Sequence, residues 1–310
     1  MQTILDRLVA VNLEIRTWSG RKKLSAEDLA LGAERPPADL VSLGSKRICD
    51  PEALQIFQRL KKTAERICLV GGVRFLGGYA IPEDRVEAVA AELDALGERF
   101  REARQAFLLG YEAAVADWVA QHPRWEAAIR RAVDPVTVIE SRLGFGYQLY
   151  RVVPAGPAGD LNARVAALGD TLFEEVAQLA GRTLEESLLG QAAMSQRAVG
   201  TFRRVREKLA CLAFVDYRVQ PVLDTLDGWL ARLPRSGPIG GALFTEGLAV
   251  ALLVSDGERM RRHGAGVLAL AELPPASPPV LNVPVDDASA GFAGDWVASR
   301  IMRRVFYHSA

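Results

Sequence analysis

Few residues in this chain are of types that do chemistry, and they are widely scattered. The histidines His122, His263 and His308 lie near the ends of predicted elements, and none has a Cys, Asp or Glu at metal-ligand spacing. The sequence also lacks a Gly-x-Ser-x-Gly nucleophile elbow, a His-Glu-x-x-His zinc motif and a paired-carboxylate motif. We therefore expect no catalytic residue, no metal and no cofactor, although residues distant in sequence can still form an active site.

The three cysteines, Cys49, Cys68 and Cys211, form no Cys-x-x-Cys pair. An odd number of widely spaced thiols is typical of a reducing compartment, and free cysteines are among the most buried residues. We expect them to be core residues of a cytoplasmic protein.

A glycine-rich segment, ICLVGGVRFLGGYAI, runs from Ile67 to Ile81. Its two Gly-Gly pairs bound a short β-rich run, which predicts a tight hairpin or a close approach of the backbone. The alternative is a ligand-binding phosphate loop. We reject that alternative because no Gly-Lys-Ser/Thr follows and neither glycine pair gives a Gly-x-Gly-x-x-Gly between a strand and a helix.

Basic side chains crowd the first part of a predicted helix over 195–233. Arg197, Arg204 and Lys208 are seven and four residues apart, so they share a helical face, and Arg203 lies beside them. A phosphate backbone could follow this stripe, extended by a closing helix with Arg300, Arg303 and Arg304. The alternative is a solvated face whose charge is balanced by Glu207 and by acids on adjoining helices.

A carboxylate at a predicted core position is the last candidate. Asp216 interrupts the heptad pattern of 195–233, and Pro221 is expected to kink that helix because it lacks an N–H. A buried acid beside a kink could be functional. We favour a polar residue that sets the helical register, or one that the kink turns outward.

The composition excludes some classes of protein. The chain has 310 residues, with 38 basic and 38 acidic side chains, so bulk electrostatic binding of nucleic acid is not expected, although a local basic face would be hidden by this total. The charged residues Asp6, Arg7 and Glu14 exclude a signal peptide at the N-terminus. The longest apolar run, Leu248 to Val254, is shorter than the roughly 20 residues of a membrane span. We expect a cytoplasmic protein without a membrane segment.

The stretch from Pro82 to His122 is predicted to be one unbroken helix around which the chain is organised. Pro82 suits the first helical position, and apolar residues recur at coiled-coil spacing from Val86 to Phe100. The pattern then shifts by one residue and resumes at Tyr111, which predicts a nearly straight seam.

Other patterns predict shorter elements in the first half of the chain. We expect helices over Thr3–Trp18, Pro51–Ile67 and Trp125–Ala132, and a strand within Arg142–Val153 that pairs with the glycine-rich segment. The basic groups 21–23 and 46–47 are interpreted as solvated loops.

In the second half, seams over 160–190 and 195–233 follow a linker at 154–160. A break is expected at Gly181, with a capping box from Thr183 to Glu186 restarting the helix. Next come an apolar helix over 239–254, a basic turn at 259–263, a proline-rich connector at 274–279, a short VLNVPV strand and a closing helix over 295–307.

The predicted fold class is mainly α, an elongated helical bundle or antiparallel coiled-coil arm with a small β element at its root. We expect N-terminal helices with the glycine-rich β segment over 1–81, the bundle over 82–234 and a C-terminal α/β element over 235–310.

Two segments resemble a known family. They are RFLGGYAIPEDRVEAVAAELDAL, which begins at Arg74, and RQAFLLGYEAAV, which begins at Arg104. Both are similar to the domain-of-unknown-function 3150 family, and the likeness extends over most of the chain. The resemblance implies a protein of bacterial mobile elements, often encoded beside a MoxR/CbbQ-type AAA+ ATPase and a von Willebrand factor A protein.

The function that these observations predict is a non-enzymatic interaction or adaptor protein of a mobile-element or defence operon, working with that ATPase and the von Willebrand factor A partner. Self-association through the helical seams is also possible. The alternative is a nucleic-acid-binding protein that uses the basic stripe.

Overall fold

The computed structural model describes residues 2–29, 44–155 and 159–267. These residues belong to one unit, Met1–Leu273, and are mostly helical with a small antiparallel sheet. This confirms the mainly α class. Among the described residues, no helix is both long and apolar enough to cross a membrane.

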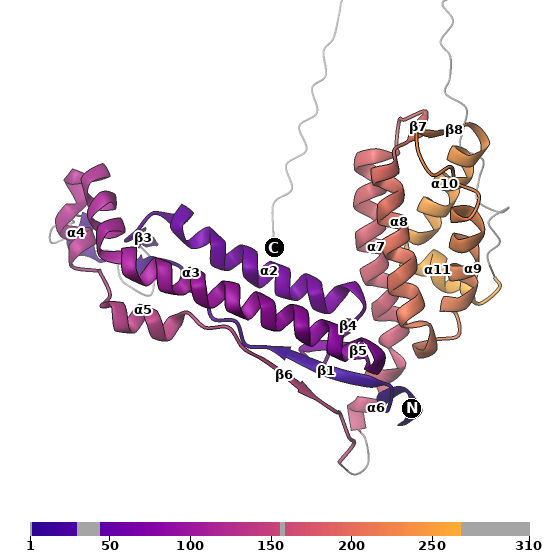
Figure 1. Ribbon diagram of the computed structural model, residues 1–310, viewed down its shortest axis with the longest axis horizontal. Helices are drawn as coiled ribbons and strands as arrows, with labels where there is room; N and C mark the ends of the chain where they lie inside the picture. Colours follow the sequence, from indigo (N-terminus) through magenta and orange to yellow (C-terminus); the bar gives the residue numbers. More distant parts are fainter. Residues whose placement is uncertain (1, 30–43, 156–158, 268–310) are drawn as a thin grey trace, which may run out of the picture. The chain divides into compact units, whose positions relative to one another are not determined.

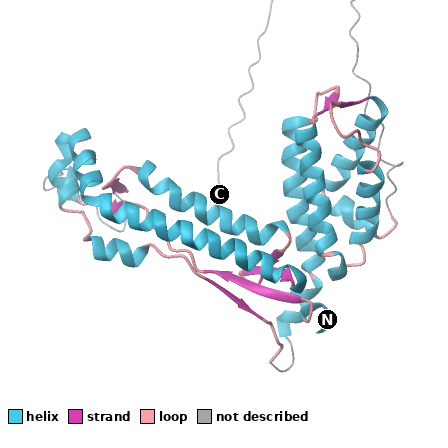
Figure 2. Ribbon diagram, viewed as in Figure 1, coloured by secondary structure: helices cyan, strands magenta, loops and turns pink. Residues whose placement is uncertain are grey.

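Helices make up most of the described part of the chain (Figures 1 and 2). They are α1 (Gln2–Leu5), α2 (Gln55–Val70), α3 (Val86–Gln121), α4 (Glu126–Arg130), α5 (Val136–Arg142), α6 (Gly159–Ala166), α7 (Leu168–Ser187), α8 (Gln196–Cys211), α9 (Val219–Leu230), α10 (Gly241–Val254) and α11 (Gly257–Gly264). Short 3₁₀ turns at 51–54, 83–85 and 123–125 lead into α2, α3 and α4.

Four strands form the main sheet, in the order β4-β5-β1-β6, and every neighbouring pair is antiparallel. These strands are β1 (Leu8–Leu13), β4 (Val73–Phe75), β5 (Gly78–Pro82) and β6 (Tyr147–Tyr150). Two small ribbons, β2 (Arg21–Lys23) with β3 (Ser45–Arg47) and β7 (Ala193–Met194) with β8 (Ile239–Gly240), complete the strands.

The expected helix over Thr3–Trp18 is wrong, because its central part is strand β1. Leu8, Val9, Ala10 and Val11 are all buried, so both faces of this strand are covered. A strand buried on both faces shows a continuous apolar run instead of an alternating one. Such a run cannot be distinguished from a helix by periodicity alone.

Strand β1 contributes to two hydrophobic clusters, one on each face of the sheet. Val9 and Val11 belong to a cluster with α2, α3 and α5. Leu8 belongs to a second cluster, which is built mainly from α7, α8, α9 and α10 and also includes Ala80 of the neighbouring strand β5. The predicted seams are therefore divided between two cores, with α3 in one and the two C-terminal seams in the other.

The predicted long helix and the glycine-rich hairpin are confirmed, but the strand expected within Arg142–Val153 was predicted to pair with the wrong segment: β6 pairs with β1, which lies between it and the hairpin. Helix α3 spans 36 residues, and its seam from Val89 to Phe100 and from Tyr111 to Val119 is buried. Strands β4 and β5 form the hairpin, with Gly77 at a positive φ of 79° in its turn. Pro82 ends β5 and precedes the 3₁₀ turn before α3, so it does not occupy the first position of the α-helix.

Two predictions about helix boundaries in the second half are wrong. Helix α7 continues through Gly181 and past the proposed capping box, because Ala180 and Leu184 on either side are buried in the core. A glycine inside a helix costs only about 1 kcal/mol, which such packing offsets. The break lies earlier, between α6 and α7 at Ala167.

The predicted helix over 195–233 is two packed helices, α8 and α9, joined by a 3₁₀ turn at 213–215. Asp216 lies in this connection, where its carboxylate accepts hydrogen bonds from the backbone N–H of Arg218 and from the Arg218 guanidinium. Pro221 is in the first turn of α9, where a helical N–H has no partner to lose, so it produces no kink. Asp216 is thus a paired buried acid at a chain turn.

The basic segments are also more ordered than predicted. Residues 21–23 and 46–47 pair as β2 and β3, and their charges are balanced by Lys22–Asp134 and Lys46–Asp28 ion pairs, both at 2.5 Å. Residues 259–263 lie within helix α11. The expected connector at 274–279, the VLNVPV strand and the closing helix at 295–307 lie outside the described residues, and the predicted domain boundaries stay a prediction.

Candidate functional site

Helix α8 carries the predicted basic stripe, and the structure separates the members of that stripe. Arg197, Arg203 and Arg204 are exposed. Lys208 is buried, with only 5% of its surface exposed, so the expectation that it faces solvent is wrong. The remaining predicted residues, Arg300, Arg303 and Arg304, lie outside the described residues.

Lys208 makes three strong contacts from its buried position. Its Nζ donates hydrogen bonds to the carbonyl oxygens of Leu69 at 2.7 Å and Gly72 at 2.8 Å. It also pairs with Glu175 Oε2 at 2.7 Å, and both side chains are more than nine-tenths buried. The other oxygen of Glu175 accepts a hydrogen bond from the backbone N–H of Arg74 at 2.9 Å. One ion pair therefore joins α7, α8, the end of α2 and strand β4.

The end of α2 explains why an ammonium group fits there. Leu69 lies in the last turn of α2, where carbonyl groups have no partner within the helix and carry the negative end of the helix dipole. Gly72 follows directly, and a Cβ atom at this position would overlap the carbonyl oxygens of Cys68 and Ala80. The absence of a side chain at Gly72 lets the backbone turn tightly and presents both carbonyls to Lys208.

Two opposing effects act on the protonation of Lys208. Burial lowers its pKa, because an ammonium group loses its hydration inside the protein, and the neighbouring Glu175 carboxylate acts in the opposite direction. Three acceptor oxygens surround the group, so each ammonium proton has a partner. This arrangement satisfies a buried charge, which is the condition for retaining one in a core.

The sequence does contain a signal for the Lys208–Glu175 pair, because each charged residue interrupts the apolar face of its helix. Lys208 lies three residues after Val205 and four before Leu212, so it interrupts an otherwise apolar face. Glu175 interrupts the face of α7 in the same way, between Leu172 and Leu179. Complementary charges on the inner faces of two neighbouring helices indicate a buried ion pair.

A basic cavity lies beside this ion pair, with a volume of about 510 Å³. Cationic side chains from α2, β4, α7 and α8 line it: Lys62, Arg66, Arg74, Arg182, Arg204 and Lys208. Apolar atoms of Leu69, Val70 and Leu179 form part of its wall.

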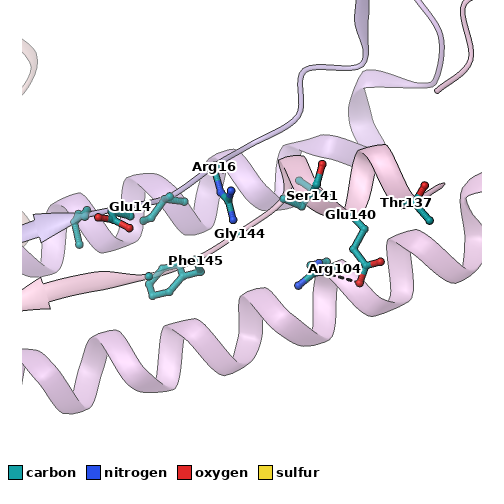
Figure 3. Close-up of a pocket in the computed structure, with 12 residues that line it drawn as sticks. Glu14, Arg16, Arg104, Thr137, Glu140, Ser141, Gly144 and Phe145 are labelled. Atoms are coloured by element: carbon teal, nitrogen blue, oxygen red, sulfur yellow. Dashed lines mark hydrogen bonds and ion pairs between the residues drawn. The ribbon is translucent and has the colours of Figure 1, made fainter. Parts of the chain in front are cut away.

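A larger polar groove, of about 960 Å³, lies where the chain enters strand β6 (Figure 3). Arg104 on α3 donates a hydrogen bond to Glu140 on α5 at 2.7 Å, which closes one side of the groove. Arg16 stacks against Gly144, where a Cβ atom would come within 2.8 Å of its guanidinium. Of the charged residues that line the groove, Arg104 and Glu140 are paired with each other, and Glu14 accepts a hydrogen bond from Gln148 of β6.

The outer edge of strand β6 is open. Arg16 and Gly144 exchange both backbone hydrogen bonds, and Glu14 N–H donates to Gly146. In an antiparallel ladder this alternation continues, so Gln148 and Tyr150 face β1, while the amides of Tyr147 and Leu149 face away. Within the described residues no strand pairs with that side, and Leu149, Tyr150 and Val153 expose apolar surface along it.

The opposite edge of the sheet is closed. Strand β4 packs against α7, and the backbone N–H of Arg74 already donates to Glu175. Edge strands with free backbone groups are templates for pairing with another chain. Among the described residues, the outer side of β6 is therefore the edge of this sheet that remains unpaired.

The histidines and cysteines within the described residues contribute to the fold, although Cys211, which was also expected in the core, is only half-buried. His122 Nδ1 contacts the carbonyl of Trp118 at 3.0 Å, and His263 Nε2 contacts Thr225 Oγ1 at 2.8 Å. Cys49 and Cys68 are buried as predicted, and burial raises their pKa values to about 11 and about 12. No group of three or more His, Cys, Asp or Glu side chains is placed to hold a metal ion in the described part of the chain.

The Lys208–Glu175 pair makes a testable prediction. Lys208→Met should lower the free energy of unfolding by about 3–5 kcal/mol, because Glu175 would stay buried without its main partner. Adding Glu175→Leu should recover a large part of this loss, since no unpaired charge then remains. Urea unfolding of the wild type, Lys208→Met, Glu175→Leu and the double variant gives the coupling energy directly.

Arg204→Met, one turn earlier on α8 and exposed, is the matched control and should change stability by less than about 0.5 kcal/mol. A Lys208→Met protein as stable as this control would contradict the assignment of Lys208 to the core.

Comparisons with known proteins agree with the segments that gave the resemblance. The model of the family described as "Protein of unknown function (DUF3150)" matches residues 5–256, which include both hydrophobic clusters apart from Met260. No curated protein and no solved structure matches the chain. Since the family model covers most of its length, this chain belongs to the DUF3150 family.

Proposed function

We propose that this chain is a non-enzymatic interaction protein, an adaptor that binds an extended segment of a partner at the open edge of β6. The observation that supports this proposal is the pairing pattern of β6, which leaves the amides of Tyr147 and Leu149 facing outward. Strand addition of this kind gains affinity from main-chain hydrogen bonds and specificity from side-chain pockets.

The surface around the edge fits a partner strand that carries apolar side chains. Val153 is 72% exposed and Tyr150 42% exposed, so a covering segment would remove apolar surface from water. Charged side chains do not shield this edge in the way that many natural edge strands are protected. Arg151 is held by Glu83 and by the carbonyl of Asp6, which directs it back toward its own chain.

The partners follow from the family resemblance. We propose that the chain works with a MoxR/CbbQ-type AAA+ ATPase and a von Willebrand factor A protein of a mobile-element or defence operon, in the cytoplasm. The predicted coiled-coil packing of the long helices, and self-association through them, stay part of this proposal.

A proline at residue 149 tests the role of the edge. Leu149→Pro removes one outward amide without touching a hydrogen bond to β1, so the protein should fold normally and bind the partner at least about tenfold more weakly. Leu149→Thr keeps the amide and should bind better than the proline variant. Co-purification with the ATPase, with and without nucleotide, and calorimetry on the purified pair give the measurement.

Wild-type chain that stays alone with both partners at micromolar concentrations would refute the proposal. Equal binding by the proline and wild-type proteins would show that the partner uses another surface. Light scattering decides whether a second copy of the chain occupies the edge.

A second candidate function is nucleic-acid binding through the exposed part of the basic stripe. Arg197, Arg203 and Arg204 all face solvent on α8, which favours contact with a phosphate backbone. Two features argue against nucleic-acid binding at this helix. Lys208 is buried, and Arg206 forms an ion pair with Asp227 at 2.7 Å.

Three phosphate contacts predict that log affinity falls with log salt with a slope of about −2 to −3. The triple variant Arg197→Glu, Arg203→Glu and Arg204→Glu should abolish retention of single- and double-stranded DNA. Reversal of the exposed Arg101, Arg124 and Arg130 changes net charge equally and should retain binding. Undetectable binding by the unmodified protein at about 50 mM salt would exclude this function.

A further inference from the structure

The basic cavity holds more positive charge than its own carboxylates can neutralise. Six cationic side chains line it, against only two acids, Glu65 and Glu175. Glu175 is fully used, because it pairs with Lys208 and accepts from the backbone and the guanidinium of Arg74. Glu65 is the one remaining acid of the lining.

Five of the six cations of the cavity come from the three helices α2, α7 and α8, and the sixth, Arg74, comes from strand β4. Lys62 and Arg66 are four residues apart on α2, and Arg204 and Lys208 are four residues apart on α8. Like charges at this spacing repel each other. Within the described residues Glu175 neutralises Lys208, but no carboxylate forms an ion pair with Lys62, Arg66, Arg182 or Arg204, so the repulsion between Lys62 and Arg66 is not relieved there.

The cavity also has an apolar wall. Leu69 and Val70 at the end of α2 and Leu179 on α7 face the same space, and Val70 is 41% exposed. A volume of about 510 Å³ lies in the range of small-molecule sites. Multiple cations beside an apolar surface suit a compact anion that carries an apolar or ring portion.

We propose that the basic cavity binds a phosphorylated small molecule with a ring portion, such as a nucleoside polyphosphate, its phosphates on Arg66, Arg182 and Arg204 and its ring against Leu69, Val70 and Leu179. Arginine guanidinium groups recognise phosphate oxygens through paired, charge-assisted hydrogen bonds. Lys208 has a different role, because it fixes α8 against the end of α2 and so holds the walls of the cavity in place.

A small ligand fits these observations better than a nucleic acid. The exposed Arg197 and Arg203 of the basic stripe do not line the cavity, so a backbone running along α8 would not use the cations collected inside it. The proposal is independent of strand addition at β6, which lies at another edge of the sheet.

Calorimetric titration of the full chain at about 50 mM salt tests this proposal with four probes: ATP, tripolyphosphate, adenosine and an oligonucleotide of about 12 residues. We expect ATP to bind with a Kd in the range of about 10–100 µM, tripolyphosphate to bind more weakly, and adenosine to give no heat. Arg182→Gln with Arg204→Gln should weaken ATP binding at least about tenfold, because two charge-assisted contacts are lost.

Arg197→Gln with Arg203→Gln is the matched control. It removes the same number of exposed charges, both from α8 and neither from the lining of the cavity, and should leave ATP binding unchanged. Equal thermal midpoints for the two double variants would show that both fold.

Three results would overturn the proposal. The first is no heat with either ATP or tripolyphosphate at about 1 mM. The second is equal loss of binding in the control variant, which would indicate general attraction of anions to the surface. The third is binding of the oligonucleotide alone, which would assign the cations to a nucleic acid.

Discussion

Strand β1 is buried on both faces and paired on both edges, and the rest of the described structure depends on this position. One face of the strand belongs to the core of α2, α3 and α5, and the other belongs to the core of the C-terminal helices. Removing β1 would therefore take buried side chains from both cores and leave β5 and β6 without a common partner. A strand in this position must be apolar on both faces. The run from Leu8 to Val11 is therefore continuously apolar, and periodicity alone did not distinguish it from a helix.

The position of β1 also determines which edges of the sheet are available. On one side, β5 and β4 lead to an edge that Glu175 closes through the backbone of Arg74, and the same carboxylate holds the Lys208 ammonium. On the other side, β6 is the last strand. The buried ion pair thus closes one edge and shapes the basic cavity, while the outer edge of β6 has no paired strand in the part of the chain that the structure describes.

Some of this arrangement follows from sequence, and some does not. Local patterns were enough to predict two elements correctly: the apolar period predicted the seam of α3, and the glycine turn predicted the hairpin around Gly77. The break between α8 and α9 was missed, because the heptad spacing continues across it while Asp216 and Arg218 form a turn that only tertiary contacts reveal. At Gly181 a helix break was predicted where there is none, since the packing of α7 outweighs the low helix propensity of glycine.

The candidate sites also depend on contacts between residues distant in sequence, which local patterns do not predict. Arg197, Arg203 and Arg204 could be assigned to a surface from helical spacing alone, and they are exposed. Lys208 shares their face by spacing, but its partners lie 33 and more residues away in sequence, on α7 and at the end of α2. The open edge of β6 depends on the order of four strands, three of which precede α3 and one of which follows it. Strand order of that kind is a long-range property that no local pattern specifies.

Amide hydrogen exchange along β6 tests the central claim, that this strand is paired on one side only. We expect the amides of Gln148 and Tyr150, which face β1, to exchange slowly, whereas those of Tyr147 and Leu149 should exchange much faster at the same pH and temperature. Binding of a partner strand should then slow Tyr147 and Leu149 selectively. Equal protection of all four amides in the isolated monomeric chain would contradict an open edge, and with it the proposed site of interaction.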